Sequence, residues 1–563
     1  MGSSYSSVTP KKDDSNKTKL PEQEDKTKPA GGKLVTINWA KDQFERIFRR
    51  TKESEGLLTH ESKYERIQIR NEEFGRFIDL GPMPMINYVQ HHQWREVFLA
   101  GPTINSAGNC GNDFPGFYYY DPHGKHEWVI IVEGNPNWQV TRCIRQCNRG
   151  RLQIGISSVQ PLPKSVFLEV WHQACSETPT QWDALKILLD VSFQLLSLPV
   201  PRSDEPDWVN IAYRCLVALR SSRTQKKVGG ITGYGAIVED LSGAGLELLP
   251  NSSLAYSLLR ASTIPKLKVA EVIGYRLIEE VIPAFFNSEL KMFVNDLDKN
   301  SAQSGKEVLE TWYLLSNLEK VIGLVGLTQD KTLKGYALES LKRIVRLAKD
   351  LDYIFPMFIN IRTANEYGQL LNPSVLGIYA LTCANAINVF PEDRETLLEE
   401  VVRSLRVLHR FRIHQIHHEP FQLALAAAAA NIAGELTGDS DIRQWRFDFA
   451  RATLLNMYRS KEYAGLFQAC AGLNYPAFKE SVETLDALNF LIKDEVLPFQ
   501  SILSLALRNN LRFFKRNGDI YELPYEGLPT KELPSAKRAG TAIYAAGCAF
   551  DLARLQVKTR DSN

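Results

Sequence analysis

The sequence predicts a mainly α-helical fold: an α/α toroid of about six helical hairpins, preceded by a small antiparallel β domain. Three observations support this prediction. The first 33 residues hold almost no large apolar groups, residues 71–177 show short β-type runs, and the chain after Pro179 has helical apolar spacing throughout. The predicted units are a tail (1–33), a β-rich domain (34–178) and a helical domain (179–563).

The N-terminal tail is rich in Lys, Asp, Ser and Pro, so it buries too little apolar surface to offset its ordering entropy. We therefore expect it to be disordered. Met1 to Ser6 fit the pattern M-G-x-x-x-[ST], which makes Gly2 a candidate for N-myristoylation. One myristoyl chain binds membranes weakly, and the tail offers no strong basic second signal. Only weak membrane association is expected from this feature.

The composition narrows the functional classes. With 44% hydrophobic and 23% charged residues, the chain resembles ordinary soluble globular proteins, and its net charge of +2 argues against a nucleic-acid partner. Eight cysteines are too few for a disulfide framework, and no apolar export segment opens the sequence, so we expect a cytoplasmic protein. The uncharged runs 367–391 and 420–434 are too polar and too short, respectively, to predict a transmembrane segment.

Short runs rich in Val, Ile and aromatic residues predict the strands of the β-rich domain. Turns rich in Gly, Asn and Pro separate them. The stretch 108–128 holds three consecutive tyrosines among glycines, prolines and acids. Such loops bind planar or sugar-like ligands, so Tyr119 and Asp121 are candidate substrate-binding residues, and a hairpin with its own aromatic packing is the alternative. The predicted strands are 76–81, 127–134, 151–160 and 165–174.

A zinc site is one interpretation of the cysteines and histidine in this domain, because their local spacings suit tetrahedral coordination. The overall separations are not those of a standard zinc finger, and buried thiols of a β core are the favoured interpretation. We therefore predict no metal and no cofactor. The residues concerned are Cys143, Cys147, His172 and Cys175.

Two kinds of helix alternate in the helical domain. Residues 331–350 and 393–411 have one apolar stripe, whereas 373–390 and 420–436 are apolar nearly all round and must be covered on every side. Alternation every 40–50 residues predicts either a closed toroid of inner and outer helices or an open α-solenoid. The connections are long and irregular and no motif repeats, which favours the toroid. This pattern resembles the six-hairpin (α/α-toroid) superfamily of carbohydrate-active enzymes, without pointing to a specific family.

A cluster of histidines precedes the second apolar helix, in the sequence RFRIHQIHHEPFQLAL. Pro420 predicts that this helix begins there, which places His418 and Glu419 at its N-terminal pole and at the mouth of a toroid cavity. We predict acid–base catalysis by His418 and Glu419, together with His414 and Glu366. A metal site is disfavoured because the H-E-x-x-H order is absent, and a structural collar at the helix start is the other alternative.

The segments 351–368 and 517–538 lead into inner helices in the same way as the histidine segment. They carry further candidates for substrate binding and for the paired carboxylates that glycosidic chemistry requires. By contrast, GGITGYGA at 229–236 has the glycines of a phosphate loop but lacks its G-K-[ST] ending. The additional substrate-binding candidates are Tyr353, Arg362, Tyr521 and Glu522.

These features together predict an intracellular enzyme, a hydrolase, lyase or isomerase, that applies general acid–base catalysis to a small molecule or glycan. The alternative is a non-enzymatic helical scaffold that binds a protein partner along a concave surface and is tethered through Gly2. A deep central pocket with convergent catalytic residues would favour the enzyme, and an open superhelix would favour the scaffold.

Overall fold

The computed structural model describes the strands of the N-terminal part of the chain and most of the chain after residue 177. Residues 1–34, with Gly2, lie outside the described residues. The described ranges are 35–36, 63–70, 77–82, 116–121, 126–133, 138–139, 151–155, 157–158, 165–175, 177–195, 198, 204–235, 246–297, 308–360, 363, 365–366, 371–416, 419–458, 463–469, 476–494, 496–524 and 540–562.

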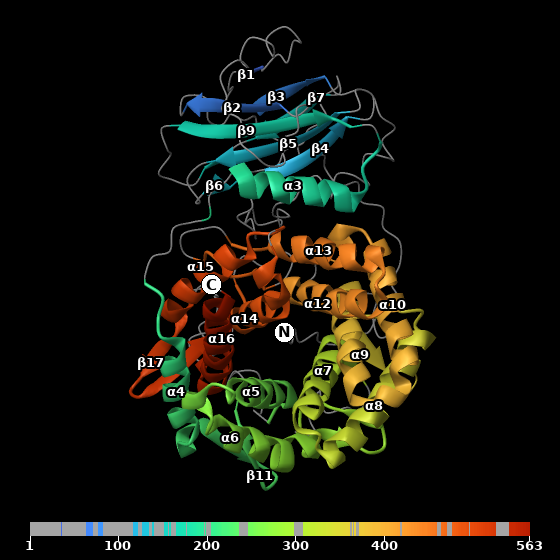
Figure 1. The fold of residues 1–563 in the computed structure, drawn as a ribbon, viewed down its shortest axis with the longest axis vertical. Coiled ribbons are helices and arrows are strands. Elements are labelled where there is room, and N and C mark those ends of the chain that lie inside the picture. The colour runs from blue at the N-terminus through green and yellow to red at the C-terminus, as the bar shows by residue number, and fades with distance from the viewer. Residues whose placement is uncertain are drawn as a thin grey trace, which may run out of the picture.

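A closed ring of inner helices forms the centre of the helical domain (Figure 1). Each inner helix contacts the next, and the last contacts the first, so the described helices form a toroid and not an open solenoid. The predicted fold class is therefore confirmed. In ring order the inner helices are α5 (Leu248–Ala261), α7 (Thr311–Thr328), α9 (Leu376–Val389), α12 (Pro420–Thr437), α14 (Phe478–Ala487) and α16 (Ala542–Ser562).

Outer helices cover this ring, and each precedes an inner helix in the chain, which gives six hairpins within the described residues (Figure 1). Short 3-10 segments extend several of them, and a π-helical turn at Leu277–Val281 extends α6. The outer helices are α4 (Trp208–Leu219), α6 (Ala270–Arg276), α8 (Lys331–Asp350), α10 (Arg394–Arg410), α13 (Ser440–Leu454) and α15 (Phe499–Asn509).

The apolar pattern of each helix explains its place. In α8 the buried residues recur at helical spacing along one stripe, from Leu333 to Ala348, and its other face is solvated. In α9 and α12 nearly every position is buried, alanines and polar residues included. Both helices are inner helices, as their lack of a polar face predicts. Proline opens α12 at Pro420, and Gly438 ends it in the left-handed conformation, with φ of 72°.

Two inner helices approach each other unusually closely at Gly377 of α9. A Cβ atom at this position would lie 2.0 Å from the backbone oxygen of Gln422 in α12. Glycine is required here because no side chain fits between the two backbones.

Alanine at position 377 is therefore expected to lower the free energy of unfolding by about 1–3 kcal/mol or more, since the two helices must move apart. Thermal or denaturant unfolding measures the effect. Gly335 is the matched control, because it lies in α8 with nothing within 4 Å of the added Cβ. Gly335→Ala is expected to be neutral or to stabilise by about 0.5–1 kcal/mol. Equal effects of the two changes would contradict the close approach.

The N-terminal domain is built on a four-stranded antiparallel sheet in the order β2-β9-β5-β4. Tyr118, Val129 and Trp171 are in register across three of its strands and are all buried. Its strands are β2 (Lys63–Arg70), β9 (Ser165–Ala174), β5 (His126–Glu133) and β4 (Gly116–Asp121). A three-stranded sheet joins β1 (Val35–Thr36) in parallel to β3 (Phe77–Pro82), which pairs antiparallel with β7 (Arg151–Gly155). β6 (Trp138–Gln139) pairs with β8 (Ser157–Ser158).

Helix α3 (Gln181–Leu195) lies between the sheet and the ring (Figure 1). It contacts β4 and β5 on one side and α13 on the other. The last strand ends at Ala174, and α3 begins shortly after the buried Pro179. The first helix of the helical part thus belongs as much to the sheet as to the ring.

Short strands complete the helical domain. β14 (Val308–Glu310), β15 (Phe358–Asn360) and β16 (Asn365–Glu366) form an antiparallel sheet at the start of α7. The other pairs are β10 (Gln225–Val228) with β11 (Ile231–Tyr234), β12 (Phe286–Asn287) with β13 (Met292–Phe293), and β17 (Lys515–Asn517) with β18 (Ile520–Pro524), which also pairs with β19 (Gly540–Thr541).

No single helix among the described residues is long and apolar enough to cross a membrane. One pair, Pro373–Val389 with Pro391–Arg410, passes by length and composition when taken together, with a bend of 119° between its two parts.

Candidate functional site

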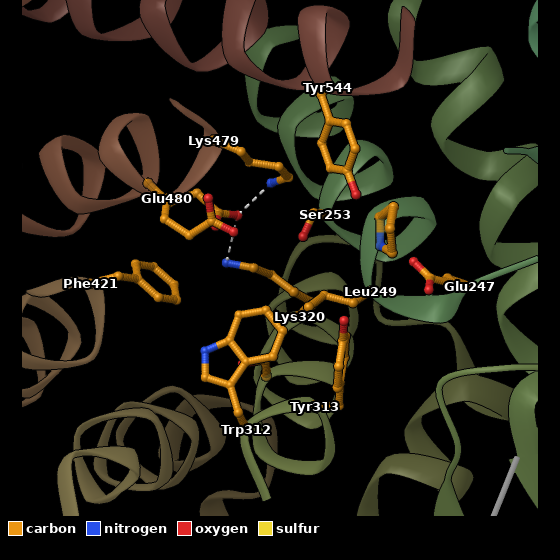
Figure 2. Close-up of a pocket in the computed structure, with 13 residues that line it drawn as sticks. Glu247, Leu249, Ser253, Trp312, Tyr313, Lys320, Phe421, Lys479, Glu480 and Tyr544 are labelled. Atoms are coloured by element: carbon orange, nitrogen blue, oxygen red, sulfur yellow. Dashed lines mark hydrogen bonds and ion pairs between the residues drawn. The ribbon is translucent and has the colours of Figure 1, made fainter. Parts of the chain in front are cut away.

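A cavity lies at the centre of the ring, at the end where the inner helices begin (Figure 2). Its space amounts to about 450 Å³, including the part that is continuous with solvent. Most of its walls come from the first turns of inner helices or from the residue before them. The lining residues are Glu247, Leu249, Pro250, Ser253, Trp312, Tyr313, Ser316, Lys320, Phe421, Lys479, Glu480, Glu483 and Tyr544.

Glutamates mark the starts of four inner helices around this cavity. Glu247, Glu310 and Glu419 occupy the N-cap positions of α5, α7 and α12, and none of the three uses its side chain to cap its own helix. Glu480 lies in the first turn of α14. Because α5 and α12 are opposite each other in the ring order, Glu247 and Glu419 approach the cavity from opposite sides.

Tyr313 of α7 lines the cavity, and the charges of four glutamates act on its hydroxyl. Burial, followed by the charges of Glu247, Glu310, Glu480 and Glu419, raises the pKa of its hydroxyl well above the usual value. Burial and then the charge of Glu247 also raise the pKa of the Tyr544 hydroxyl well above its usual value. Figure 2 shows the two hydroxyl groups directed toward one another from α7 and α16. Tyr313, Tyr544, Glu247 and Glu480 all line the cavity, whereas Glu310 and Glu419 lie at helix starts and are not among its lining residues.

Burial raises the pKa of Glu419 to about 8, and the nearby charges of Glu480 and Glu310 add to this effect. Contacts with Gln422 and Trp312 partly oppose it. The helix N-terminus was expected to suit an ionised carboxylate at this position. Burial and like charges outweigh that effect, so Glu419 carries a proton near neutral pH.

The pKa of Glu247 is raised to about 7, again mainly by burial and then by the charge of Asp296. A backbone bridge between Glu247 and Asp296 holds these two carboxylates near each other. Burial also raises the pKa of Glu310. A carboxyl group that titrates close to pH 7 thus lines the cavity, and one that is protonated near neutrality stands at the start of α12, two residues before the lining Phe421.

Hydrogen bonds connect Glu419 to the neighbouring inner helix. The amide of Gln422 donates to Glu419 Oε2 at 2.9 Å, and its carbonyl accepts a short hydrogen bond from the hydroxyl of Ser374. Ser374 belongs to η8 (Pro373–Val375), the 3-10 turn before α9, and its hydroxyl also lies 2.8 Å from Asn372 Oδ1. Ser374 and Gln422 are fully buried, so this chain of polar groups fixes one face of the acid.

A buried ion network joins α7 and α14 at the cavity (Figure 2). Lys320 of α7 lies 3.4 Å from Glu483 of α14, the inner helix opposite, and 3.0 Å from Glu319. Lys479 lies 2.7 Å from the same Glu483 oxygen. Burial alone would raise the pKa of Glu483, but the two lysines outweigh it and lower that pKa to about 2. Glu483 is therefore ionised at neutral pH and forms ion pairs with both lysines.

Two of the four predicted catalytic residues lie at this end of the ring. Glu419 is the N-cap of α12, as the position of Pro420 predicts, but it is not among the residues that line the cavity. Glu366 is on β16, in the same small sheet as Glu310 of β14, although its side chain is not described. His414 lies on α11 (Ile413–Ile416), and its side chain is also not described. His418 and the neighbouring His417 lie outside the described residues.

The predicted substrate-binding residues do not gather at the cavity. Tyr119 and Asp121 are on β4, in the sheet of the N-terminal domain. The Tyr353 hydroxyl donates to Glu400 of the outer helix α10 at 2.8 Å, and the residue is 5% exposed. Tyr521 and Glu522 are on β18, which contacts α4 and α16. Arg362 lies outside the described residues.

Sequence reasoning missed most of the residues that line the cavity. A usable signal is present: a glutamate stands at the start of several inner helices, in LELLP, LETWY, HEPFQ and FKESV. Only the glutamate of the third sequence, Glu419, is among the predicted site residues, because it alone adjoins a cluster of histidines. The buried lysines carry no comparable signal, since Lys320 and Lys479 look like ordinary helix-surface residues in the sequence.

No protein-family model and no curated protein matches the sequence. Similar solved structures include a GH76 α-mannanase of Bacteroides thetaiotaomicron, with 10% identity, a TM-score of 0.43, and coverage of 64% of this chain and 98% of that one. A cellobiose 2-epimerase from Bacillus thermoamylovorans has 12% identity, a TM-score of 0.44 and coverage of 62% and 99%. A D-mannose isomerase has 8% identity, a TM-score of 0.45 and coverage of 63% and 100%. Likenesses at this level say nothing of the reaction of this chain.

Among the described residues, no group of three or more His, Cys, Asp or Glu side chains is arranged to hold a metal ion. Of the residues considered for a zinc site, Cys143 and Cys147 and the His172 side chain are not described, and Cys175 is a free thiol.

The raised pKa of Glu419 predicts a specific pH dependence of stability. A carboxyl group whose folded-state pKa lies above its unfolded value, near 4.5, stabilises the fold fully below that pH and progressively less up to about pH 8. The glutamine in Glu419→Gln stays neutral at every pH. The free energy of unfolding of this variant is therefore expected to rise relative to that of wild type by up to about 1.4 kcal/mol per pH unit within this window. Unfolding at pH 5, 6.5 and 8 measures the difference. A difference that is constant over this range would contradict the burial of Glu419.

Proposed function

We propose that the protein is an enzyme that applies general acid–base catalysis to a small polyhydroxylated substrate, such as a sugar or a glycan end, in the ring cavity. The observation that carries the proposal is a cavity lined by Glu247 and Glu480, with Glu419 two residues before the lining Phe421, and with the pKa values of Glu247 and Glu419 raised to about 7 and about 8. Groups that titrate near neutral pH are those that transfer protons efficiently.

Glu419 is assigned the role of general acid, because it holds its proton near neutral pH. Glu247 is assigned the role of general base, because its lower pKa leaves a substantial fraction ionised at pH 7. Glu247 lines the cavity, and Glu419 precedes the lining Phe421 on the opposite inner helix, which supports a substrate position between these two helices. Environments that push two carboxyl pKa values apart are how one site provides both an acid and a base.

The walls of the cavity support a sugar-like substrate. Trp312, Tyr313, Phe421 and Tyr544 offer aromatic surface on which a pyranose ring can stack. The carboxylate of Glu480 and the hydroxyl of Ser253 also face the cavity and suit the hydroxyl groups of such a substrate. Hydrolysis, elimination and isomerisation all need the same pair of proton-transfer groups, and the proposal covers these three reactions.

The scaffold alternative requires an exposed concave surface. The described helices close into a ring, and polar and aromatic side chains line a cavity at its centre. We therefore favour the enzyme over the scaffold.

A substrate screen tests the proposal. The purified protein is incubated with a panel of neutral, amino and uronic oligosaccharides and their monosaccharides, and the products are separated by anion-exchange chromatography and examined by NMR. We expect wild-type protein to convert at least one member of the panel, and the Glu247→Gln and Glu419→Gln variants to be much slower. Conversion that is unchanged in both variants, or absent across the panel, would argue against the proposal.

A further inference from the structure

The segment that leads to Glu419 is held by helix α3, which also carries the N-terminal sheet. Gln181, the first residue of α3, contacts the segment twice. Its amide donates to the backbone oxygen of Phe411 at 2.8 Å, and its carbonyl accepts from the backbone N–H of Ile413 at 3.0 Å. One side chain thus bridges the end of α10 and the start of α11.

Trp182, the next residue of α3, holds the preceding part of the same segment. Its indole N–H donates to the backbone oxygen of His409 at 3.0 Å, and its ring stacks on the imidazole at 4.6 Å. On the other side, the imidazole stacks on Trp445 of α13 at 5.1 Å, and its Nε2 lies 2.9 Å from Asp448. Trp182 is 7% exposed, so this contact is part of the core.

The far end of the segment is fixed as well. Ile413 and Ile416 of α11 are buried, and α11 contacts η8. η8 carries Ser374, which is hydrogen bonded to Gln422, and Gln422 in turn donates to Glu419. The backbone from His409 to Ile416 is therefore clamped between α3 on one side and the hydrogen-bond chain of Glu419 on the other.

We propose that α3 positions the acid Glu419, with Gln181 as the positioning residue, so that the N-terminal sheet and the cavity are mechanically coupled. The effect of this coupling on catalysis rests on the proposed function, whereas the positioning of Glu419 by α3 does not. The competing interpretation is that Gln181 and Trp182 only satisfy the free carbonyl groups at the end of α10. That interpretation predicts a loss of stability without any effect on Glu419.

The pH dependence that Glu419 gives to stability separates the two interpretations without a substrate. Groups on four elements act on Glu419: Glu310 from β14, Trp312 from α7, Glu480 from α14, and Gln422 from its own helix α12. If Gln181 holds Glu419 among these groups, a change at Gln181 that loosens residues 409–416 must admit water to Glu419. The pKa of Glu419 would then move back toward its ordinary value.

The experiment compares Glu419→Gln with its parent between pH 5 and pH 8, in wild-type, Gln181→Ala and Gln181→Glu backgrounds. We expect the pH-dependent part of the difference to fall to less than half in both Gln181 backgrounds. Gln181→Glu keeps an acceptor for Ile413 and removes the donor to Phe411, so it provides a folded variant if the alanine is unstable. The double variant Asp190→Leu with Arg451→Met is the control, because it replaces the buried ion pair between α3 and α13 (3.2 Å) without touching residues 409–413.

A pH-dependent difference that persists unchanged in the Gln181 variants would overturn the proposal. So would the absence of any such difference in wild-type protein, because the pKa of Glu419 would then not be raised in the folded state. An equal reduction in the control would show that general docking of α3, and not Gln181, is responsible, and would also overturn it. The sugar screen tests the proposed function separately, so failure of one leaves the other standing.

Discussion

Glutamine in place of Glu419 is expected to lower turnover by roughly 10²-fold or more, the usual scale for the loss of a positioned acid or base. The side chains are nearly isosteric, and the amide can still accept the hydrogen bond from Gln422, which is 2.9 Å long in the parent. Only the transferable proton is lost. The effect should therefore appear in kcat, with KM for the converted sugar little changed.

Glu435→Gln is the matched control, because Glu435 lies near the other end of the same helix, is exposed, and is hydrogen bonded only to Asn431 in the described structure. Its activity should equal that of wild type. The pH profile adds a second check, since activity that depends on protonated Glu419 should fall as the pH rises through about 8. If Glu419→Gln retained full activity at every pH, the acid would have to be assigned to another residue.

Glutamine in place of Glu483 is expected to lower the free energy of unfolding by about 3–5 kcal/mol, because it leaves Lys320 and Lys479 buried without their shared partner. Both lysine side chains are less than one-tenth exposed, so water cannot replace the lost carboxylate. Lys320 retains Glu319 at 3.0 Å, whereas Lys479 has no second carboxylate partner within the described part of the chain. Denaturant unfolding measures the change.

The pH dependence of this effect has a definite sign. A carboxylate whose pKa is lowered to about 2 stabilises the fold above its unfolded pKa, near 4.5, and loses that contribution as the pH falls toward 2. Wild type and Glu483→Gln should therefore converge in acid and differ fully at neutral pH. Glu339→Gln, exposed on the outer helix α8, is expected to show little effect at any pH. A small loss for Glu483→Gln at neutral pH would mean that solvent reaches the network.

Much of the fold could be predicted from the sequence because helix burial is a local pattern. The pattern predicts how much of each helix must be buried: one face for 331–350, and the whole surface for 373–390 and 420–436. Pro420 set the start of α12 through its own restricted geometry. Outer and inner helices and their alternation follow from these features alone. The closure of the ring does not, since it depends on contact between α16 and α5, which are far apart in the chain.

The site was only partly predictable, for a different physical reason. Glu419 was found because proline and histidines mark its position in the sequence, and the N-terminal pole of an inner helix points to the cavity in any toroid. Its raised pKa was not foreseen, because it depends on Glu480 and Glu310, which approach from α14 and from the start of α7. Tyr353 was expected at the cavity, but its hydroxyl donates to Glu400 on the outer helix α10.

The sequence by itself determined the elements: which segments form helices, which of them are buried on all sides, and where α12 begins. Those properties depend on residues within a few turns of one another. The tertiary structure alone decided which charged groups meet, since Lys320 and Glu483 are paired across the ring and Gln181 reaches Ile413 over a separation of 232 residues. Interactions between distant residues depend on ring closure and helix placement, and no local pattern in the chain records them.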